Sequence, residues 1–494
     1  MQGSGNAQAV QEVVARARAA QAVAASWDQW RVDDVVAGVG WQCYQMDISR
    51  RLAELSYVET AFGDVDDLHT LYRRRVLGIL ADMHGQTTVG VVDDLPELGI
   101  RKLAKPVGVI AVASPATAPS SAIVCSLLPM IKTRNAAVFT ANPRARGVAI
   151  ETIRIVRHAL SQMGAPADLV QYLEVPGKDA VEKLMAASDL VVAVGGAGTV
   201  RRAYTSGTPA IGAGVGNPTV IVDETANVRL AAQQIRFGAS FNNGISCSSE
   251  SNILIHTSVF ANFRENLRRN GAYFCTRTEA ARVRDVLWPD GKVLDRQWLG
   301  IPANALALAA NIQTGMEKQV TILALPCDDP RRDSPILREK LSPIVTVSTF
   351  DNFDEAIELV SDISDRCGRG HSCGIFSNDE EHISMLAERV CTARVVVNQS
   401  TTTNTGSFQN GVAFTTILSS GTWGGCSFSE NVTWSNFLNY TTISWPIEKR
   451  IPDERLIFGK HWRAVEISTI GSSDEYDEGG YSCIPDSVFT EHTS

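Results

Sequence analysis

Residues 107–140 read VGVIAVASPATAPSSAIVCSLLPMIKTRNAAVFT, which is an apolar run, a polar turn containing prolines, a helical run and a second apolar run. The apolar runs at 107–113 and 136–140 have the length and composition of buried strands, and residues 121–131 have those of a helix. A strand, a helix and a strand of these lengths predict a parallel βαβ unit. The chain is therefore expected to have an α/β fold.

The same alternation continues along the chain. Helical runs at 148–163 and 180–187 alternate with apolar runs at 170–173 and 190–194. A second α/β layer is expected after residue 240, with strands at 253–255, 320–325, 344–349, 373–377 and 394–398. Before residue 107, the helical spacing of apolar residues over 7–85 predicts helices. Two β-type runs at 87–92 and 99–105 predict a hairpin.

Composition excludes several classes of protein. The chain has 494 residues, 44% of them hydrophobic, and a net charge of −9, which suits two or three soluble domains. No stretch concentrates Lys and Arg, so we expect no nucleic-acid partner. The N-terminal helix interleaves charged residues with Ala and Val, and the apolar run at 122–131 is too short to cross a bilayer. We therefore expect a cytoplasmic protein without a membrane partner.

The cysteines point to a reducing compartment. Ten of them are scattered without regular spacing, which does not suggest a disulfide framework. Cys367 and Cys373 flank His371, but no further pair completes a set of four ligands. We expect no metal site.

Three predicted strand ends are candidate ligand contacts, because ligands of parallel sheets bind beyond the carboxyl ends of the strands. They are residues 114–117, 140–146 and 195–199. Glycines at 195, 196 and 198 precede a predicted helix, whose free N–H groups suit a pyrophosphate. The order GxGxxG is lacking, so a plain tight turn is the competing interpretation.

Cys247 lies at the middle of the stretch SFNNGISCSSESNILI, residues 240–255. Asn242, Asn243 and Gly244 predict a turn, and small polar residues then surround the thiol. Such a loop is how a nucleophile is usually presented, since a thiolate must be reachable. A buried structural cysteine is the competing interpretation.

Eight segments in this order resemble the CoA-acylating branch of the aldehyde dehydrogenase superfamily. They are KPVGVI (105–110), KTRNA (132–136), GG (195–196), PAIGAGVGN (209–217), the Cys247 loop, EKLSP (339–343), GH (370–371) and GTWGG (421–425). The resemblance covers residues 7–447. It implies a Rossmann-type cofactor domain, an α/β catalytic domain and a β oligomerisation arm.

The domain boundaries expected on this resemblance are 1–238 for the N-terminal helices and dinucleotide-binding domain, including an arm hairpin at 87–105, then 239–430 for the catalytic domain, 431–449 for the oligomerisation arm and 450–494 for a polar tail. A two-stranded arm is barely stable alone, so a homodimer or homotetramer is expected.

The resemblance implies thiol chemistry. An aldehyde would be oxidised to its acyl-CoA thioester through addition to Cys247, hydride transfer to NAD or NADP, and displacement by coenzyme A. Hydrolytic members activate water with the Glu of an ELGGK segment, and the matching segment here begins at Gly212. Without that base the acyl-enzyme should survive until coenzyme A arrives. A glycine required only for a turn is the alternative.

Two other functions compete with this hypothesis. A hydrolytic dehydrogenase that forms the free acid is disfavoured by Gly212. A non-catalytic scaffold that kept the fold would be expected to lose Cys247, which is present.

The resemblance assigns three further roles. Glu339 matches a contact of the nicotinamide ribose, with an exposed carboxylate as the alternative. His371 matches an active-site histidine that could act as a base for the coenzyme A thiol, with a loop-capping histidine as the alternative. Thr117 lies where hydrolytic members place an oxyanion-hole Asn, although relatives read Thr-Asn-Pro and this chain reads Thr-Ala-Pro.

Cofactor contacts are expected from Ser114, Pro115, Thr140, Asn142, Arg144, Gly195, Gly196, Thr199, Gly212 and Glu339. Many NAD-specific relatives hold the adenosine ribose with a Glu where this chain has Pro143. Arg144 and Arg146 follow, and a guanidinium can pair with a 2′-phosphate. We therefore expect NADP to be used at least as well as NAD.

The resemblance also indicates which aldehyde is the substrate. The segments CSSES (247–251) and WPDGK (288–292) are most similar to those of the acylating enzymes of sulfoacetaldehyde, with acetaldehyde and succinate semialdehyde as alternatives. A sulfonate needs several donors, which we expect from Ser246, Ser248, Thr401 and Thr402. An ordinary solvated loop is the competing interpretation of residues 400–405.

Overall fold

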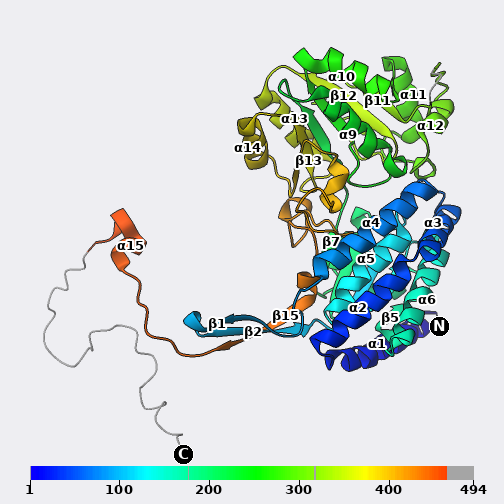
Figure 1. Ribbon diagram of the computed structural model, residues 1–494. Coiled ribbons are helices and arrows are strands. Elements are labelled where there is room, and N and C mark those ends of the chain that lie inside the picture. Colours follow the sequence, from blue (N-terminus) through cyan, green and yellow to red (C-terminus); the bar gives the residue numbers. More distant parts are fainter. Residues whose placement is uncertain (1, 176, 316–318, 464–494) are drawn as a thin grey trace, which may run out of the picture. The chain divides into compact units, whose positions relative to one another are not determined.

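The computed structural model describes residues 2–175, 177–315 and 319–463. It contains two units, one of residues 1–96 and 100–444 and a small one of residues 97–99 and 445 onward. The α/β fold class predicted from the sequence is confirmed in the larger unit (Figure 1).

The helices of the larger unit are α1 (Gln2–Ala25), α2 (Gln29–Tyr44), α3 (Met46–Thr60), α4 (Val65–Met83), α5 (Pro119–Lys132), α6 (Arg146–Gln162), α7 (Lys178–Ala187), α8 (Ala197–Tyr204), α9 (Val228–Ser240), α10 (Thr257–Arg269), α11 (Arg277–Leu287), α12 (Ala303–Ala309), α13 (Phe353–Arg366) and α14 (Glu380–Arg389). Its strands are β1 (Gly90–Leu95), β2 (Ile100–Pro106), β3 (Val109–Ser114), β4 (Ala136–Ala141), β5 (Val170–Tyr172), β6 (Leu190–Val194), β7 (Ala210–Ala213), β8 (Thr219–Val222), β9 (Asn252–His256), β10 (Ala272–Phe274), β11 (Ile322–Pro326), β12 (Ile344–Phe350), β13 (Cys373–Phe376), β14 (Val395–Val397) and β15 (Leu438–Ser444).

The first sheet has five parallel strands in the order β5-β4-β3-β6-β7. This is a Rossmann-type order, and it reverses between β3 and β6, which is where ligands of such sheets bind. In the register, Ile110 pairs with both Ala137 and Leu190. The strand predicted from 107 begins two residues later, because Gly108 has a φ of +131° that ends the regular extended backbone before it.

Helices surround this sheet and share one core with it. α5 is buried along its whole length, because it packs beside β4 and contacts α2, α4 and α6. These helices lie side by side in Figure 1. α1 packs beside α7, as the alternation of Ala and Val with polar residues in α1 requires.

The second sheet has seven parallel strands in the order β10-β11-β12-β9-β8-β13-β14. Its two faces are covered by separate apolar clusters, one around Leu323 and Ile375 and the other around Ile253 and Val345. The sequence predicted five of these strands. It missed β8 and β10, which have four and three residues, because such short runs carry little pattern.

The chain passes from the first sheet to the second between β7 and β8. β8 pairs with β9 and β13 and so belongs to the second sheet. A division by sheets therefore falls between Ala213 and Thr219, whereas the domain boundary expected from the sequence is at residue 238.

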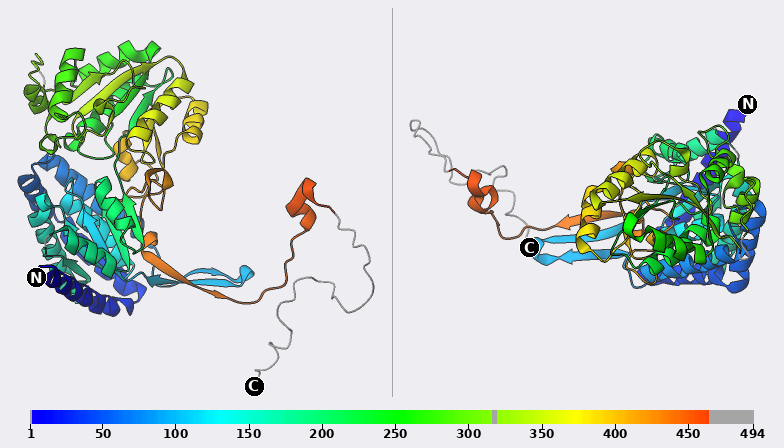
Figure 2. Two further views of the ribbon diagram at one scale, coloured as in Figure 1. Left: turned by 180° about the vertical axis from the view of Figure 1, so that it is seen from behind. Right: turned by 90° about the horizontal axis from the view of Figure 1, so that it is seen from above.

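The predicted hairpin at 87–105 forms a third, antiparallel sheet of β1, β2 and β15, shown in two further views in Figure 2. β15 pairs with β2 from Leu438 opposite Pro106 to Ser444 opposite Ile100. Six of the seven β15 residues are exposed. β15 is thus an edge strand, and its outer side pairs with no other strand within the described residues.

In the small unit, residues 454–458 form the short helix α15 (Glu454–Phe458). Leu456 and Ile457 on it are exposed, so the described start of the expected polar tail is more apolar than predicted. Residues 464–494 lie outside the described part.

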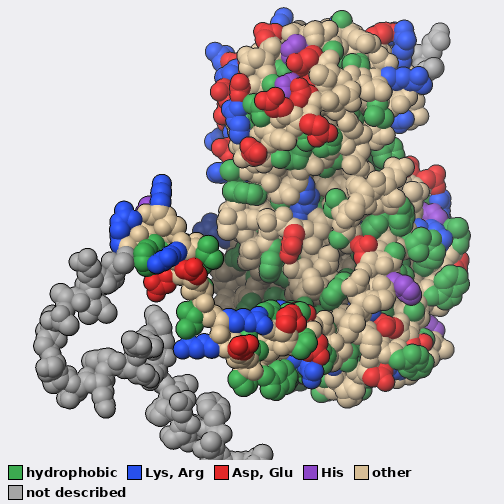
Figure 3. All heavy atoms as spheres, turned by 60° about the vertical axis from the view of Figure 1, so that its left-hand side comes forward, with side chains coloured by type: hydrophobic (Ala, Val, Ile, Leu, Met, Phe, Trp, Pro, Cys, Tyr) green, Lys and Arg blue, Asp and Glu red, His purple; other side chains and the backbone are tan. Residues whose placement is uncertain are grey.

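The surface of the described chain is mixed in charge. Figure 3 shows Lys and Arg side chains interspersed with Asp and Glu over the face in view. No helix within residues 2–175, 177–315 and 319–463 is long and apolar enough to span a bilayer.

Candidate active site

The Cys247 loop is held against the start of α4 by two asparagines. Asn242 and Asn243 have φ of +51° and +52°, a left-handed conformation that Asn tolerates better than most residues. The Asn242 backbone N–H donates to Asp67 Oδ2 at 2.7 Å, and its side-chain Oδ1 accepts from the Asp64 N–H at 2.9 Å. Asn243 Nδ2 donates to the carbonyl of Gly63 at 2.8 Å. The turn predicted here is therefore fixed by tertiary contacts as well as by its own sequence.

The Cys247 side chain is partly exposed. Burial raises the pKa of its thiol to about 11, the carboxylate of Glu339 raises it further, and Ser248, Arg75 and Arg394 lower it. The resting thiol is thus protonated at neutral pH. Both arginines favour the thiolate that a nucleophilic role requires.

Cys247 opens into a pocket of about 80 Å³. The walls come from α4, the loop after β3, the end of β6, the Cys247 loop and the turn at 401–405, so both sheets contribute. Four residues predicted as site residues lie on it with Cys247: Pro115, Thr117, Ser246 and Thr402. No Asp or Glu lines this pocket within the described residues.

Two carboxylates line a second space beside Cys247. A narrower space of about 10 Å³ is lined by Cys247, Glu250 and Glu339. Glu339 Oε1 accepts from the Gly216 N–H at 3.1 Å, and burial raises its pKa to about 7. Glu339 is only partly exposed, and it follows a 3-10 turn rather than ending a helix. The alternative of an exposed helix-end carboxylate is therefore wrong.

Ser248 and Thr401 lie behind the loop. Ser248 is fully buried, and its carbonyl accepts from Thr401 Oγ1 at 2.7 Å. The Thr401 N–H donates to Glu250 Oε1 at 2.8 Å. Neither residue lines the 80 Å³ pocket. The run 400–405 is mostly buried, so its interpretation as a solvated loop is wrong.

His371 is buried away from that pocket. Its Nδ1 lies 2.9 Å from Ser372 Oγ, and its Nε2 has no hydrogen-bond partner within the described residues. Burial, together with the charge of Arg394, lowers the pKa of His371 to about 3, so the ring is neutral at physiological pH. Ser372 Oγ also accepts from Asn404, which links His371 to the turn at 401–405.

Gly212, the residue matched to the missing base, lies on β7 and faces α8. A Cβ at this position would lie 2.8 Å from Tyr204 Cε2 and 2.8 Å from Val200 Cγ1. The Tyr204 hydroxyl accepts from the N–H groups of Gly212 at 3.0 Å and Ser427 at 3.1 Å. A tyrosine thus fills the space beside Gly212.

The expected cofactor contacts gather at one edge of the five-stranded sheet. Ser114 and Thr140 lie in the carboxyl-terminal halves of β3 and β4, and Gly195 follows β6. A Cβ on Gly195 or Gly196 would meet nothing within 4 Å, and the N-terminus of α8 has no side-chain cap. The buried Ser114 Oγ has no partner within the described residues. This edge has the room and the free donors that a pyrophosphate needs.

The remaining predicted contacts surround this edge. Asn142 Oδ1 accepts from the Arg144 N–H at 3.0 Å. Arg144 is exposed, and it donates to the Arg296 carbonyl at 3.4 Å. Thr199 Oγ1 accepts from Arg202 at 3.3 Å. The Arg144 guanidinium also lies over the Phe62 ring, 5.8 Å from the centroid, so a ligand from solvent would replace weak, exposed contacts of Arg144.

The sequence analysis missed the two charged residues that line the pocket, Arg74 and Arg75 of α4. A signal was available for Arg75. It lies on the apolar face of the helix, three and four residues after Tyr72 and Leu71, and it is 8% exposed.

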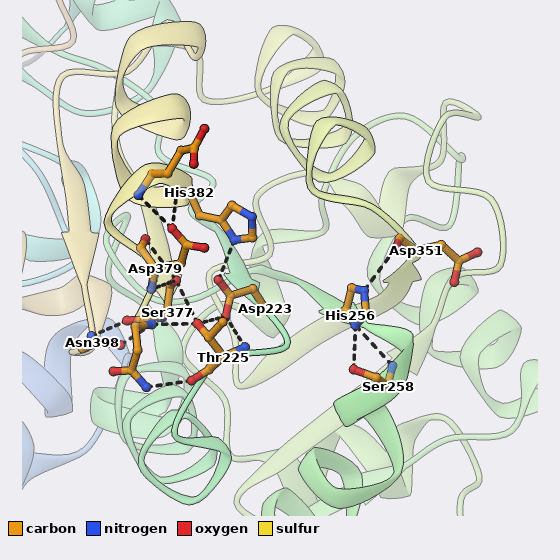
Figure 4. A network of polar contacts seen from close by, with 11 residues as sticks. Asp223, Thr225, His256, Ser258, Asp351, Ser377, Asp379, His382 and Asn398 are labelled. Carbon is orange, nitrogen blue, oxygen red and sulfur yellow. Dashed lines mark hydrogen bonds and ion pairs between the residues drawn. The ribbon is translucent and has the colours of Figure 1, made fainter.

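A separate polar network anchors the end of β8 (Figure 4). Asp223 is fully buried and accepts from the Thr225 N–H and hydroxyl, while His382 Nδ1 lies 2.9 Å from its Oδ2. His382 stacks on Phe353 with 3.8 Å between ring centroids. With Glu224 these residues could hold a metal ion, but protein groups already satisfy both Asp223 oxygens. The network explains how α14 is attached to the second sheet.

Comparison with known proteins agrees with this geometry. The model of the aldehyde dehydrogenase family matches residues 3–274 and 303–422. Sulfoacetaldehyde dehydrogenase (acylating) of Cupriavidus necator is 36% identical over 461 residues, with 93% of each chain covered. Succinate-semialdehyde dehydrogenase (acetylating) of Clostridium kluyveri is 31% identical over 92% of this chain and all of its own.

Solved structures show the same fold. An acetylating aldehyde dehydrogenase from Geobacillus thermoglucosidasius has a TM-score of 0.87 at 29% identity, covering 92% of this chain and 100% of its own. Propionaldehyde dehydrogenase of Rhodopseudomonas palustris, solved with bound CoA and an acylated cysteine, has a TM-score of 0.80 at 25% identity, covering 88% and 97%. The chain belongs to the aldehyde dehydrogenase family.

Proposed function

We propose that this enzyme oxidises a small aldehyde to its acyl-CoA thioester, with NAD or NADP as the electron acceptor and Cys247 as the nucleophile. One observation carries the proposal: the wider of the two spaces that Cys247 lines has no Asp or Glu among its described residues to activate water, and Glu250 and Glu339 line only the narrower one. An acyl group held on Cys247 in such a pocket is available to a thiol. Relatives named as acylating dehydrogenases support the same reaction.

The reaction balances as aldehyde, coenzyme A and NAD(P)⁺ going to acyl-CoA, NAD(P)H and one proton. The Cys247 thiolate adds to the carbonyl carbon, and the carbonyl oxygen becomes an alkoxide. The alkoxide collapses to a thioester as the C–H electron pair leaves as a hydride. When bound, the nicotinamide supplies the acceptor for that hydride. The thiolate of coenzyme A then attacks the thioester, and Cys247 leaves as a thiolate.

The surrounding residues assist these steps in the proposal. Arg75 and Arg394 stabilise the Cys247 thiolate, since both lower the pKa of the thiol. The Thr117 hydroxyl lines the pocket and would donate to the alkoxide, together with the Cys247 backbone N–H. His371 is the proposed base for the coenzyme A thiol, because its Nε2 has no hydrogen-bond partner within the described residues. Burial and Arg394 lower the pKa of His371 to about 3, so the ring as it stands is neutral but weakly basic.

The cofactor would be held at the edge formed by β3, β4 and β6. The open Gly195-Gly196 turn and the uncapped start of α8 fit its pyrophosphate. Arg144 would bind a 2′-phosphate, which favours use of NADP. A relative solved with bound NADP⁺, an engineered glycolyl-CoA reductase, supports this choice.

Sulfoacetaldehyde is the proposed substrate, because the sulfoacetaldehyde dehydrogenase of C. necator covers nearly the whole chain at 36% identity. Acetaldehyde and succinate semialdehyde are the alternatives. A cytoplasmic homodimer or homotetramer is also proposed. The exposed edge of β15 would pair with a second copy.

The deciding experiment measures NAD(P)H formation from sulfoacetaldehyde with and without coenzyme A, and identifies the product. Cofactor reduction that requires coenzyme A and forms the thioester is expected. Free acid formed without coenzyme A would identify a hydrolytic dehydrogenase instead. The Cys247→Ala variant should lose all turnover yet still bind cofactor, whereas Cys327→Ala, at another partly exposed cysteine, should not lose it.

A further inference from the structure

Helix α4 directs two consecutive arginines at the wall of the Cys247 pocket. Arg74 is partly exposed, and Arg75 is 8% exposed. Both line the pocket together with Thr117 and Cys247. The turn that carries Cys247 is fastened to the start of the same helix through Asp64 and Asp67. The positions of the arginines and of the thiol are therefore set by one rigid element.

Neither guanidinium has a partner among the residues that the structure describes. Within residues 2–175, 177–315 and 319–463, no hydrogen bond or ion pair engages Arg74 or Arg75. Two other interior cations differ: Arg394 donates to Asn431, His371 and Ser419, and Lys340 donates to Ser251 and Asn252. A buried cation without hydrogen bonds is costly, so its retention indicates a partner that arrives from outside.

Both arginines remain charged at neutral pH. Burial lowers the pKa of Arg74 to about 10, with a further contribution from Arg75, and burial also lowers that of Arg75. The groups whose negative charge would raise the pKa of Arg75 are the thiols of Cys125 and Cys247 once they are ionised, and burial and Arg75 are what act on the pKa of Arg74. When Cys247 ionises for catalysis, its thiolate offsets part of the positive charge at Arg75, and Arg74 has no anion of its own among the described residues.

We propose that Arg74 and Arg75 bind the anionic end of the aldehyde, with Arg74 as its main partner and Arg75 shared between that anion and the Cys247 thiolate. The inference rests on the proposed function and specifies its substrate class: a short aldehyde that ends in a sulfonate or a carboxylate. A pocket of about 80 Å³ suits a chain of a few atoms. Guanidinium groups are well matched to either oxyanion, because their donors form a planar fork.

Kinetics of charged and neutral aldehydes test the proposal. The specificity constant with coenzyme A is measured for sulfoacetaldehyde, succinate semialdehyde and propionaldehyde. The ratio of an anionic to the neutral substrate should fall about 10- to 100-fold in Arg74→Gln, the loss expected for a charge-assisted hydrogen bond. Arg74→Lys should restore part of it. Whichever anionic substrate has the higher ratio in the wild type identifies sulfonate or carboxylate as the natural group.

The matched control is Arg73→Gln on the same helix. Arg73 stacks on Tyr44 at 3.8 Å and donates to the Tyr44 carbonyl, so it is engaged elsewhere. Removing its charge should leave the substrate ratio as in the wild type. If Arg73→Gln lowers the ratio as much as Arg74→Gln does, the preference for anionic substrates comes from the overall positive charge of α4 and not from a contact with Arg74. That result overturns the proposal.

A second measurement does not depend on turnover. Ethanesulfonate should protect Cys247 from alkylation by iodoacetamide, followed by mass spectrometry of the Cys247 peptide. Arg74→Gln should weaken this protection about tenfold or more. Equal protection in both proteins overturns the anion site even if the acylating reaction is demonstrated. Conversely, if no aldehyde is turned over with coenzyme A, the proposed function is wrong. Protection by ethanesulfonate that requires Arg74 would still support the anion site in that case.

Discussion

The main chain at Gly216 lies directly against Cys247. A Cβ at position 216 would be 2.1 Å from the Cys247 carbonyl oxygen and 2.9 Å from its Cβ. The Gly216 N–H also donates to Glu339. Gly216 therefore packs closely against the loop that presents the thiol, and no larger residue fits there without moving that loop.

We predict that Gly216→Ala displaces Cys247 and lowers kcat by about 100-fold or more, since a shift of about 1 Å in a reacting group has that effect. Gly214→Ala is the matched control, because a Cβ at Gly214 meets nothing within 4 Å. Steady-state kinetics and thermal unfolding of both variants check this. Wild-type kcat in a folded Gly216→Ala protein would contradict the close packing.

The reactivity of the thiol should depend steeply on pH. Because the pKa of Cys247 is raised to about 11, its thiolate fraction rises about tenfold per pH unit through the neutral range. Alkylation of the cofactor-free enzyme by iodoacetamide should follow this slope up to at least pH 9. Arg75→Gln should slow alkylation at every pH below the plateau, since Arg75 lowers the thiol pKa.

Arg73→Gln is again the control for this experiment, and it should leave the alkylation rate as in the wild type. A rate that is already constant between pH 6 and pH 8 would mean that the resting thiol is ionised, in contradiction to its burial.

Cofactor preference can be assigned to one side chain. Arg144→Ala should raise KM for NADP about tenfold while changing KM for NAD much less, because only NADP carries the 2′-phosphate that the guanidinium would pair with. Arg154→Ala, which removes an exposed arginine paired with Glu151 on α6, serves as control. Parallel rises in both KM values would refute a specific phosphate contact.

Much of the fold can be predicted from the sequence, because the spacing of apolar residues that marks a strand or a helix is visible within a short segment. The runs at 136–140 and 190–194 correspond closely to β4 and β6. The Cys247 turn was also readable, since Asn and Gly tolerate its left-handed backbone. The placing of Thr117 near Cys247 was predicted from the family resemblance and not from the spacing of apolar residues. In the structure both residues line one pocket.

Other features depend on tertiary contacts that no local pattern encodes. The arginines at 73–75 form one charged run, yet Arg73 stacks on Tyr44 while Arg74 and Arg75 enter the pocket. Likewise, Ser248 and Ser246 are two residues apart in the same loop, and only Ser246 lines the pocket. Which member of such a run meets a ligand is decided by the packing of α4 and of the loop.

The space beside Gly212 gives the sharpest test of why a thioester would be formed. Gly212→Glu alone should lower Tm, because its Cβ would lie 2.8 Å from Tyr204 Cε2 and the ring would have to leave the two N–H groups that it accepts from. Combined with Tyr204→Ala, the glutamate gains room to turn toward the acyl-enzyme. We predict that this double variant releases more free acid relative to acyl-CoA than Tyr204→Ala alone. Product ratios measured at equal conversion decide the matter: if the folded double variant and its control release the same fraction of acid, the absence of a base at position 212 does not explain the choice of coenzyme A over water.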